Sequence, residues 1–565
     1  MVRMPNLRAA QRKTEEQQMK FTGLDYRAEP SDGSCSDCSG ITSRAYPSIR
    51  PRNRMETIAR YQQLTCLKGF GNDVLICAGT NIYWNGSKVG TLTYLNERGE
   101  IDVTTRRHAE MVNTQIVILP DKLIFDTSTG GVEPIDGMYP ASGFVVYRQF
   151  VEEEQQYYHI LDFSMGISDD ADRSGADDLF QQVQLNDTVF LTGFTSIGTA
   201  WSVDNKPDGI TVRYIDREGY RIGFYDSSFP KKDEEATNGT EYVNGKKYTP
   251  HTETLYFEYR CPELELIAEA DNRLWGTAGN TIYACALGSP RNWFRYDGLA
   301  DDAYALAVAG NAPFTAIKGY GTHVCFFKAD CIHRVYGSKP SNYSLNTLLC
   351  PGVQSGGEET VQVINGVLWY AAPSGIYAYD GSSAECVSAQ LGIQTIDADF
   401  AAAAEEGYYI EMDCGHGRQL YCLDTNNAIW MIWDKGWYAA AANVGGKLTL
   451  ATAAGEILQA AEDVTQEEWS ITLNEFTEGV AGRKSYSKLV IQCDMAREAH
   501  MEIAVRFDGG RWIPAFAIEG KYGQRVMYAP LPPNRCYGMA AQIKGRGDVT
   551  IKGIARAYSL LSDVR

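Results

Sequence analysis

The sequence predicts an all-β protein whose main body is a β-propeller of six to eight blades. Strand-like runs of five to eight residues dominate the chain, and Gly, Asn, Asp or Pro bounds each of them. The 54 glycines and 34 tyrosines suit such a fold, because glycines turn the chain and aromatic side chains cover pleated surfaces. Helical periodicity is confined to Gln11–Met19 and Phe400–Glu406.

A repeated phrase supports the propeller. It consists of an apolar stretch, a short turn with Gly or Asn, and then Ile-Tyr, which predicts two adjacent antiparallel strands. The clearest copies span residues 73–86, 272–284 and 365–381, with weaker copies at 115–126, 322–336, 418–433 and 447–459. Ile282, Ile332, Ile376 and Ile429 are separated by 50, 44 and 53 residues, close to the length of a four-stranded blade. Such units are stable only when they close into a ring.

The phrases and the changes in composition between them divide the 565 residues into five segments. We expect no transmembrane helix or membrane anchor, because no run reaches the roughly 18 apolar residues that a span requires. The predicted segments are an N-terminal arm and loop leading into the propeller (1–55), the first blades (56–137), an inserted β domain (138–259), the remaining blades (260–463) and a C-terminal β-sandwich (464–565).

The charge balance limits the classes of function. The chain has 52 basic and 71 acidic residues, a net charge of −19. A protein that coats DNA needs a basic face, so that class is disfavoured, whereas an acidic wall lets duplex DNA slide past. The alternative is that the charge serves solubility alone. The 14 cysteines fall at irregular intervals inside apolar runs, which indicates buried thiols in a protein made in a reducing cytoplasm.

Catalytic signatures are missing from the sequence. It has no zinc-protease, nucleophile-elbow, phosphate-loop or dinucleotide motif, and its seven histidines do not pair at ligand spacing. We therefore expect no enzyme, no catalytic residue and no cofactor. Cys35 and Cys38 have redox or half-zinc-site spacing, but no second pair follows at finger spacing, so a turn is favoured there.

One acidic stretch matches the opening of a calcium loop. Asp170, Asp172 and Ser174 take the first, third and fifth positions, and Asp178 takes the ninth. The twelfth position holds Gln181 in place of the expected Glu, and no flanking helices are evident. The stretch is thus a candidate metal site, with an acidic, solvated loop as the favoured interpretation.

Three short segments resemble tail-associated β-propeller proteins of tailed bacteriophages, of the nozzle or packaged-DNA stabilisation type. Residues 43–54 resemble the opening of those proteins, residues 287–293 resemble their "Gly-Asp-Pro-x-Asn-Trp" turn, and the region from Tyr486 to Tyr558 is similar to their C-terminal sandwich. The 138–259 insertion has no counterpart in this resemblance. The chain also looks more like proteins of phages that infect Gram-positive hosts, which leaves its station along the tail open.

The resemblance implies a virion structural protein of the tail, assembled in the bacterial host cytoplasm. Its expected partners are other copies of itself in a ring, as a hexamer, together with neighbouring tail proteins and duplex DNA in transit. The main basic cluster of the first hundred residues would then contact DNA phosphates or the acidic surface of a neighbouring subunit. The favoured interpretation is structural: the arginines clamp a loop onto the propeller rim. That cluster consists of Arg44, Arg50, Arg52 and Arg54.

The rival hypothesis is a receptor- or glycan-binding propeller at the tail tip. In that case exposed tryptophans would stack on sugar rings, although propeller blades use such residues more often in their cores. The candidates are Trp275, Trp293, Trp369, Trp430, Trp433 and Trp437.

Overall fold

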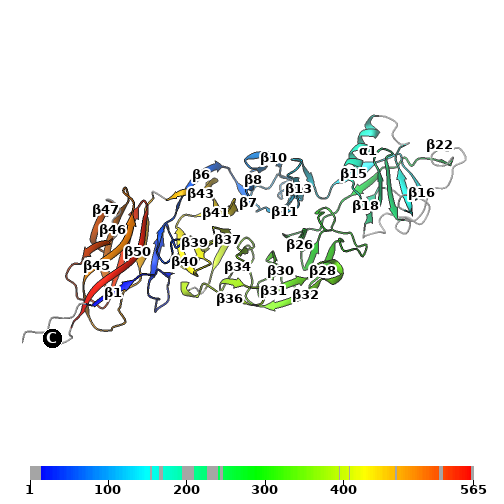
Figure 1. Cartoon of the computed structure of the whole chain (residues 1–565). Helices are drawn as coiled ribbons and strands as arrows, with labels where there is room; N and C mark the ends of the chain where they lie inside the picture. Colours follow the sequence, from blue (N-terminus) through cyan, green and yellow to red (C-terminus); the bar gives the residue numbers. More distant parts are fainter. Residues whose placement is uncertain are drawn as a thin grey trace, which may run out of the picture.

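The computed structural model is almost entirely β-structure, arranged as an elongated molecule of three parts (Figure 1). It describes residues 14–152, 155–164, 170–193, 209–225, 240–241, 246–392, 395–405, 407–464, 467–520 and 526–561. The inserted segment with α1 lies at one end, the sandwich formed by β45 to β50 lies at the other, and small sheets fill the middle. No helix in the described ranges is long and apolar enough to cross a membrane.

Seven four-stranded antiparallel sheets form the middle part of the described chain. In six of them the strands follow one another in sequence order, as the repeated phrase predicted. The strands of the first four are β7–β10 (Leu64–Phe70, Asp73–Ala78, Asn81–Trp84, Ser87–Thr91), β11–β14 (His108–Val112, Gln115–Leu119, Leu123–Asp126, Val132–Pro134), β25–β28 (Leu266–Ala270, Arg273–Ala278, Thr281–Ala284, Tyr304–Ala307) and β29–β32 (Ala316–Tyr320, His323–Lys328, Cys331–Tyr336, Ser344–Leu349).

The remaining three sheets complete the series. The last of them takes three strands from one region and its fourth, β6, from the N-terminal arm. Their strands are β33–β36 (Gln362–Ile364, Val367–Ala372, Gly375–Tyr379, Ala384–Cys386), β37–β40 (Asp397–Ala404, Gly407–Asp413, Arg418–Asp424, Ile429–Asp434), and β41–β43 with β6 (Tyr438–Val444, Lys447–Thr452, Glu456–Val464, Asn53–Arg60).

Hydrophobic clusters join each of these sheets to the next. Leu75 and Ile116 belong to the cluster between the first and second sheets, and the series continues to the seventh. A further cluster brings Val444 of the seventh sheet against Ile76 of the first. The first strand of the seventh sheet, β41, also contacts the first strand of the first sheet, β7. This is a β-propeller-like arrangement, and the predicted all-β class is confirmed.

The repeated phrase forms the expected strand pairs. β8 pairs with β9, β26 with β27 and β34 with β35, all antiparallel. Ile282, Ile332 and Ile376 occupy the third strands of their sheets, whereas Ile429 begins the fourth strand of the sixth sheet. The spacing of 53 residues before Ile429 therefore includes one extra strand, and the phrase is out of phase there.

The segment predicted as an inserted domain contains β15 to β24 and has its own core. Its ends meet, because β15 pairs with β24 and Met138 lies opposite Glu258. Its described residues form two four-stranded sheets, a two-stranded sheet and one helix. Their bounds are β15 Met138–Ala141, β16 Val145–Val151, β17 Gln156–Asp162, α1 Asp170–Gln182, β18 Thr188–Thr192, β19 Ile210–Thr211, β20 Tyr214–Asp216, β21 Arg221–Tyr225, β22 Thr240–Glu241, β23 Lys247–Tyr248 and β24 Leu255–Glu258.

The C-terminal sandwich takes strands from both regions of the chain. One sheet has the order β1-β50-β45-β48, and the other has the order β2-β3-β44-β49-β46-β47. Three strands of the N-terminal arm, β1 to β3, therefore belong to the sandwich, and its strands β4 and β5 pair with each other. The strands of the arm before β6 are β1 Thr14–Gln18, β2 Gly23–Leu24, β3 Ser34–Ser39, β4 Ile41–Thr42 and β5 Arg50–Pro51. The remaining strands of the sandwich are β44 Trp469–Leu473, β45 Lys484–Met495, β46 His500–Phe507, β47 Ile513–Glu519, β48 Val526–Pro530, β49 Met539–Arg546 and β50 Val549–Leu560.

The described residues of both stretches with helical periodicity lie mostly in strands, and residues 11–13 and 406 lie outside the described part. Thr14–Gln18, within the predicted Gln11–Met19 helix, pairs along its whole length with β50. Phe400 lies in β37, which is the first strand of its sheet and pairs with β38. In both cases the hydrogen bonds and packing of a sheet override a weak local preference, as is common for short segments.

Candidate functional site

The first strands of the seven sheets surround two cavities on the axis of the ring-like part. A cavity of about 160 Å³ is lined from β7, β37, β41 and the start of β11. A second, of about 40 Å³, is lined from β7, β11, β25, β29 and β33. Lys68, Ala109 and Glu359 line both cavities, so the two lie side by side along the axis.

Charged side chains fill the space between these cavities. Lys68 Nζ donates to Glu110 Oε1 at 2.9 Å, and His108 Nδ1 lies 3.5 Å from Glu359 Oε1. Burial disfavours the Lys68 cation, yet its pKa is raised because Glu110 and Glu359 lie close. Burial likewise opposes the charge of Glu359, and the Lys68 ammonium and His108 hold the pKa of that carboxyl well below its usual range. Paired groups of opposite charge therefore lie in the lining of these axial cavities.

A lysine on β29 stands apart from these pairs. Lys318 lines the smaller cavity, and burial lowers its pKa, with the Lys68 ammonium as the second cause. Glu110, Glu359 and Glu269 act on Lys318 in the opposite direction. The axial lining therefore combines cationic and anionic groups and presents no surface of one sign.

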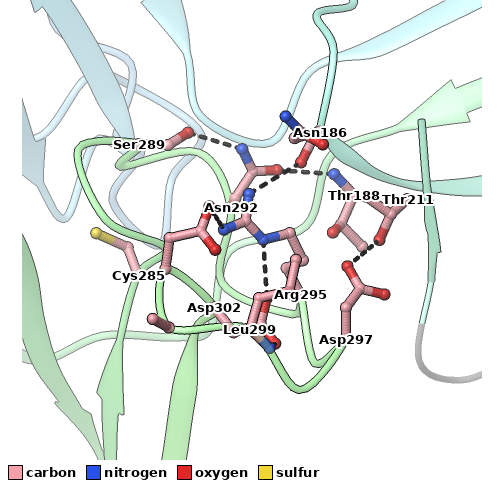
Figure 2. Close-up of polar contacts among 12 residues, drawn as sticks. Asn186, Thr188, Thr211, Cys285, Ser289, Asn292, Arg295, Asp297, Leu299 and Asp302 are labelled. Atoms are coloured by element: carbon pink, nitrogen blue, oxygen red, sulfur yellow. Dashed lines mark hydrogen bonds and ion pairs between the residues drawn. The ribbon is translucent and has the colours of Figure 1, made fainter. Parts of the chain in front are cut away.

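The junction between the inserted segment and the third sheet is the other notable site. The loop after β27 runs from Cys285 to Asp302 against β18 and β19, and polar side chains join the two (Figure 2). Asn292 is buried; its Oδ1 accepts from Thr188 N at 2.8 Å, and its Nδ2 donates to Asp187 at 3.0 Å. Thr211 Oγ1 donates to Asp297 at 3.1 Å.

A second buried group stiffens the same loop. Arg295 Nε donates to Asp302 at 3.1 Å, and Asp302 accepts the Leu299 amide at 2.8 Å (Figure 2). Beside this network lies a cleft of about 830 Å³ with Asn, Gln, Asp and Arg side chains prominent in its lining. The junction is therefore predominantly polar, whereas the sandwich shares one continuous hydrophobic cluster with the fifth and sixth sheets.

The predicted arginine cluster binds acidic groups of its own chain. Arg52 is buried; its Nη2 donates to Asp434 at 2.7 Å and to Glu467 at 2.9 Å, and its guanidinium lies 4.5 Å from the Trp433 ring centroid. Arg54 Nε donates to Asp463 at 3.0 Å.

The other two arginines of the cluster have the same kind of partner. Arg44 pairs with Glu405, and Arg50 lies 3.9 Å from Asp548. Together the four arginines connect the N-terminal arm to the sixth sheet, the seventh sheet and the sandwich.

The calcium-loop hypothesis assumed a loop, and the backbone there is helical. The segment from Asp170 to Gln182 forms α1, so Asp170, Asp172, Ser174 and Asp178 lie on a helix and not in a twelve-residue calcium loop. Asp178 is exposed, and the side chains of 170–175 lie outside the described part. Among the described residues, no group of three or more His, Cys, Asp or Glu side chains is placed to hold a metal ion.

The remaining candidate residues are largely buried. Cys35 and Cys38 lie on β3 with no exposed thiol, so the turn expected there is a strand. Five of the six candidate tryptophans are core residues, and Trp437 is the exception at 65% exposed. The buried five are Trp275, Trp293, Trp369, Trp430 and Trp433.

Sequence reasoning did not identify the axial charges or the junction residues. Lys68 and Glu110 belong to different sheets, and Glu359 lies in the segment before β33. Asn292 binds residues 104 and 105 positions away. The turn at 287–293, singled out by resemblance, was the one signal that pointed to the junction.

Comparisons with known proteins give no family. No family model matches the chain, and no curated protein matches it. Among solved structures it is similar to the computationally designed Ika8 protein (9% identity, TM-score 0.33, covering 72% of this chain and 98% of that one). It is also similar to a glutaminyl cyclase from Myxococcus xanthus (9%, 0.20, 35% and 88%) and an exo-beta-1,3-galactanase from Phanerochaete chrysosporium (7%, 0.20, 57% and 100%). Likenesses at these TM-scores carry no argument about function.

Proposed function

We propose that this chain is a non-enzymatic structural protein of a bacteriophage tail, built on a closed seven-bladed β-propeller. In this proposal several copies, six by our expectation, form a ring in the tail that conducts or retains the genome. The ring is assembled in the cytoplasm of the bacterial host and contacts neighbouring tail proteins. The resemblance of residues 43–54, 287–293 and 486–558 to tail propeller proteins suggests this class.

The observation that carries the proposal is the fastening of the first and last sheets by one N-terminal strand. β6 pairs with β43 through Ala59 and Ile457, and the same arm continues into the sandwich as β1 to β3. A ring closed in this way resists opening, because its last sheet cannot separate from the first without breaking a β-ladder. Such rigidity suits a load-bearing subunit.

In this proposal the path of the DNA lies between copies of the chain. The axial cavities of one chain measure only about 160 and 40 Å³, so the proposed conduit for duplex DNA would be enclosed by several chains around a common centre. The net charge of −19 suits such a wall, because acidic side chains repel phosphate and do not hold the duplex. The inserted segment and the sandwich lie at opposite ends of the molecule (Figure 1), where each could meet a neighbouring copy.

The mass of the purified protein in solution tests the proposal. Native mass spectrometry is expected to give a hexamer, and class averages of negatively stained particles are expected to show a ring with an open centre. A variant without residues 138–259 is the matched comparison that tells whether the insertion or the sandwich makes the ring contacts. A monomer at all concentrations that binds cell-wall polysaccharide through Trp437 would overturn the ring and support the receptor-binding alternative.

A further inference from the structure

Two cysteines face one another across neighbouring strands at the seam of the ring-like part. Cys66 on β7 and Cys77 on β8 are direct partners in the antiparallel register. Side chains at such positions project to the same face of a sheet, with their Cβ atoms about 4.5–5.5 Å apart. A disulfide needs Cα atoms about 4.4–6.8 Å apart, which both kinds of antiparallel pair satisfy.

The two thiols interact in the folded protein. The pKa of Cys77 is raised well above its usual value, and the hydrogen bond to the Cys66 thiol is the first cause, ahead of burial. Both residues belong to the hydrophobic cluster between the first and second sheets. Neither forms a disulfide in the structure.

Cys66 also lines the larger axial cavity. That cavity holds about 160 Å³ and presents Lys68, Arg106 and Arg107 beside Cys66. Cys66 is 8% exposed and Cys77 has no exposed surface, so an oxidant in this cavity meets the Cys66 sulfur first. Cys77 is fully buried behind it, in the position of a resolving cysteine.

We propose that Cys66 and Cys77 are a redox pair, and that a small peroxide reaching the axial cavity converts them to a cross-strand disulfide. The Cys66 thiolate attacks one peroxide oxygen; an S–O bond forms, the O–O bond breaks, and hydroxide leaves. The Cys77 thiol then attacks the Cys66 sulfur; the S–S bond forms, the S–O bond breaks, and the second oxygen leaves as water with the thiol proton. The hydroxide takes up the proton that the Cys66 thiol released, so the two thiols are oxidised by two electrons and one hydrogen peroxide is reduced to two waters.

The disulfide would join β7 to β8 where the first sheet meets the last, since β7 packs against β41. A protein made in a reducing cytoplasm would carry the free thiols and acquire the bond after release into an oxidising medium. This inference goes beyond the proposed tail function and does not depend on it.

A second pair in the chain provides a built-in comparison. Cys35 and Cys38 on β3 also interact through their thiols, which is the first cause of the raised pKa of Cys35. Both are buried, and neither lines the axial cavities. Cys386 is exposed and reports on the oxidant itself.

The test is oxidation of the reduced full chain with a small excess of hydrogen peroxide, followed by alkylation and peptide mapping. The expected result is a linked Cys66–Cys77 peptide with the mass of two hydrogens lost, while Cys35 and Cys38 remain alkylated. Cys66→Ser and Cys77→Ser should abolish the link, and Cys386→Ser should leave it unchanged. The oxidised wild-type protein should also show a higher thermal midpoint than the reduced one.

Two outcomes would overturn the inference. One is oxidation of Cys386 with Cys66 and Cys77 still fully alkylated. The other is linkage of Cys35 to Cys38 at the same rate as Cys66 to Cys77, because access from the axial cavity would then make no difference. Both readouts come from the wild-type chain, so they stand even where a serine variant fails to fold.

Discussion

Arg107 has no exposed side-chain surface and directly precedes β11, the first strand of the second sheet. Its Nε donates to Asp121 at 2.9 Å, and Asp121 is equally inaccessible. Asp121 also accepts the amides of Thr93 and Tyr94, so the pair ties the connection between the first two sheets. Removing one partner leaves the other charge buried without compensation, which is costly in a low-dielectric interior.

We therefore predict that Arg107→Ala lowers the free energy of unfolding by about 3–5 kcal/mol. The matched control is Arg60→Ala, because Arg60 also pairs with an acidic residue, Glu456, but is 74% exposed. That change should cost no more than about 1 kcal/mol. Urea denaturation monitored by tryptophan fluorescence measures both free energies of unfolding. Equal decreases in the two variants would contradict the predicted cost of leaving Asp121 buried without its partner.

Glu411 is a buried carboxyl whose charge is only partly compensated. Arg418 Nη1 donates to its Oε2 at 2.7 Å, while Oε1 has no hydrogen-bond partner among the described residues. Burial raises the pKa of Glu411 to about 7; Arg418 opposes this, and Asp399 and Asp397 add to it. The folded state thus holds this proton more tightly than the unfolded chain, whose glutamate has a pKa near 4.5.

The sign of the pH effect follows from that difference. The stabilisation from the bound proton is fully present below pH 4.5 and is lost as the pH rises through about 7. Glu411→Gln cannot ionise, so we predict that its stability relative to wild type increases as the pH rises from 5 to 8. Urea midpoints of the two proteins across this range measure the difference. The control is Glu385→Gln on the exposed edge strand β36, whose stability should depend on pH as that of wild type does. If the stability of Glu411→Gln also followed the wild-type pH dependence, the role given to Glu411 would be disproved.

At the scale of elements, the two ends of the molecule are attached differently. The sandwich shares a hydrophobic cluster with the fifth and sixth sheets. The inserted segment meets the loop after β27 through the hydrogen bonds of Asn292, the ion pair of Arg213 with Asp297 and a ring contact between Phe190 and Phe294. Polar junctions between domains yield more readily than apolar ones. The inserted segment is therefore expected to change orientation more easily than the sandwich.

Asn292→Ala tests this difference. It removes the acceptor for the Thr188 amide and leaves Asp187 with one donor fewer, so we expect a local loss of about 1–3 kcal/mol. Hydrogen exchange should become faster in peptides that cover β18, while peptides of β45 and β50 stay unchanged. Asn96→Ala, in an exposed turn, is the control; unchanged exchange at β18 in Asn292→Ala would contradict the role given to this residue.

The elements differ in how well the sequence predicts them. The phrase of two apolar strands around a turn is local, and it predicted the pairs β8–β9, β26–β27 and β34–β35. β6 has no such signal, since its residues alternate poorly and its partner β43 lies about four hundred positions away. α1 was missed because its acidic start favours a loop in isolation, although acidic residues are also suited to the first turn of a helix.

The candidate site was harder to predict for the same physical reason. The axial charges come one or two at a time from separate sheets, and each looks like an ordinary strand residue in the sequence. The arginines of the arm were visible, but their partners Asp434 and Glu405 become evident only when the arm is placed beside the sixth sheet.

At the scale of the whole molecule, the insertion should be separable from the ring-like part. Gly137 O accepts the Tyr259 amide at 2.9 Å, so the two ends of the insertion already lie together. We predict that removing residues 138–259 and joining the ends leaves a soluble body with one cooperative unfolding transition.

The control deletion removes one sheet of the ring, β33 to β36. It should give an insoluble or non-cooperative product, because the clusters on both sides of that sheet lose their partners. Calorimetry of the two deletion variants distinguishes them. Loss of cooperative unfolding in the first variant would show that the 138–259 segment supports the ring.

The pairing of β6 with β43 also has a consequence for synthesis. At about 5–20 residues per second, roughly 20–80 s pass between translation of Arg60 and of Val464. Throughout that interval β6 has no strand to pair with, and the apolar face of the first sheet that packs against the seventh sheet is exposed to solvent. Folding chaperones of the producing cell should therefore retain the nascent chain until β43 emerges, and their depletion should reduce the soluble yield.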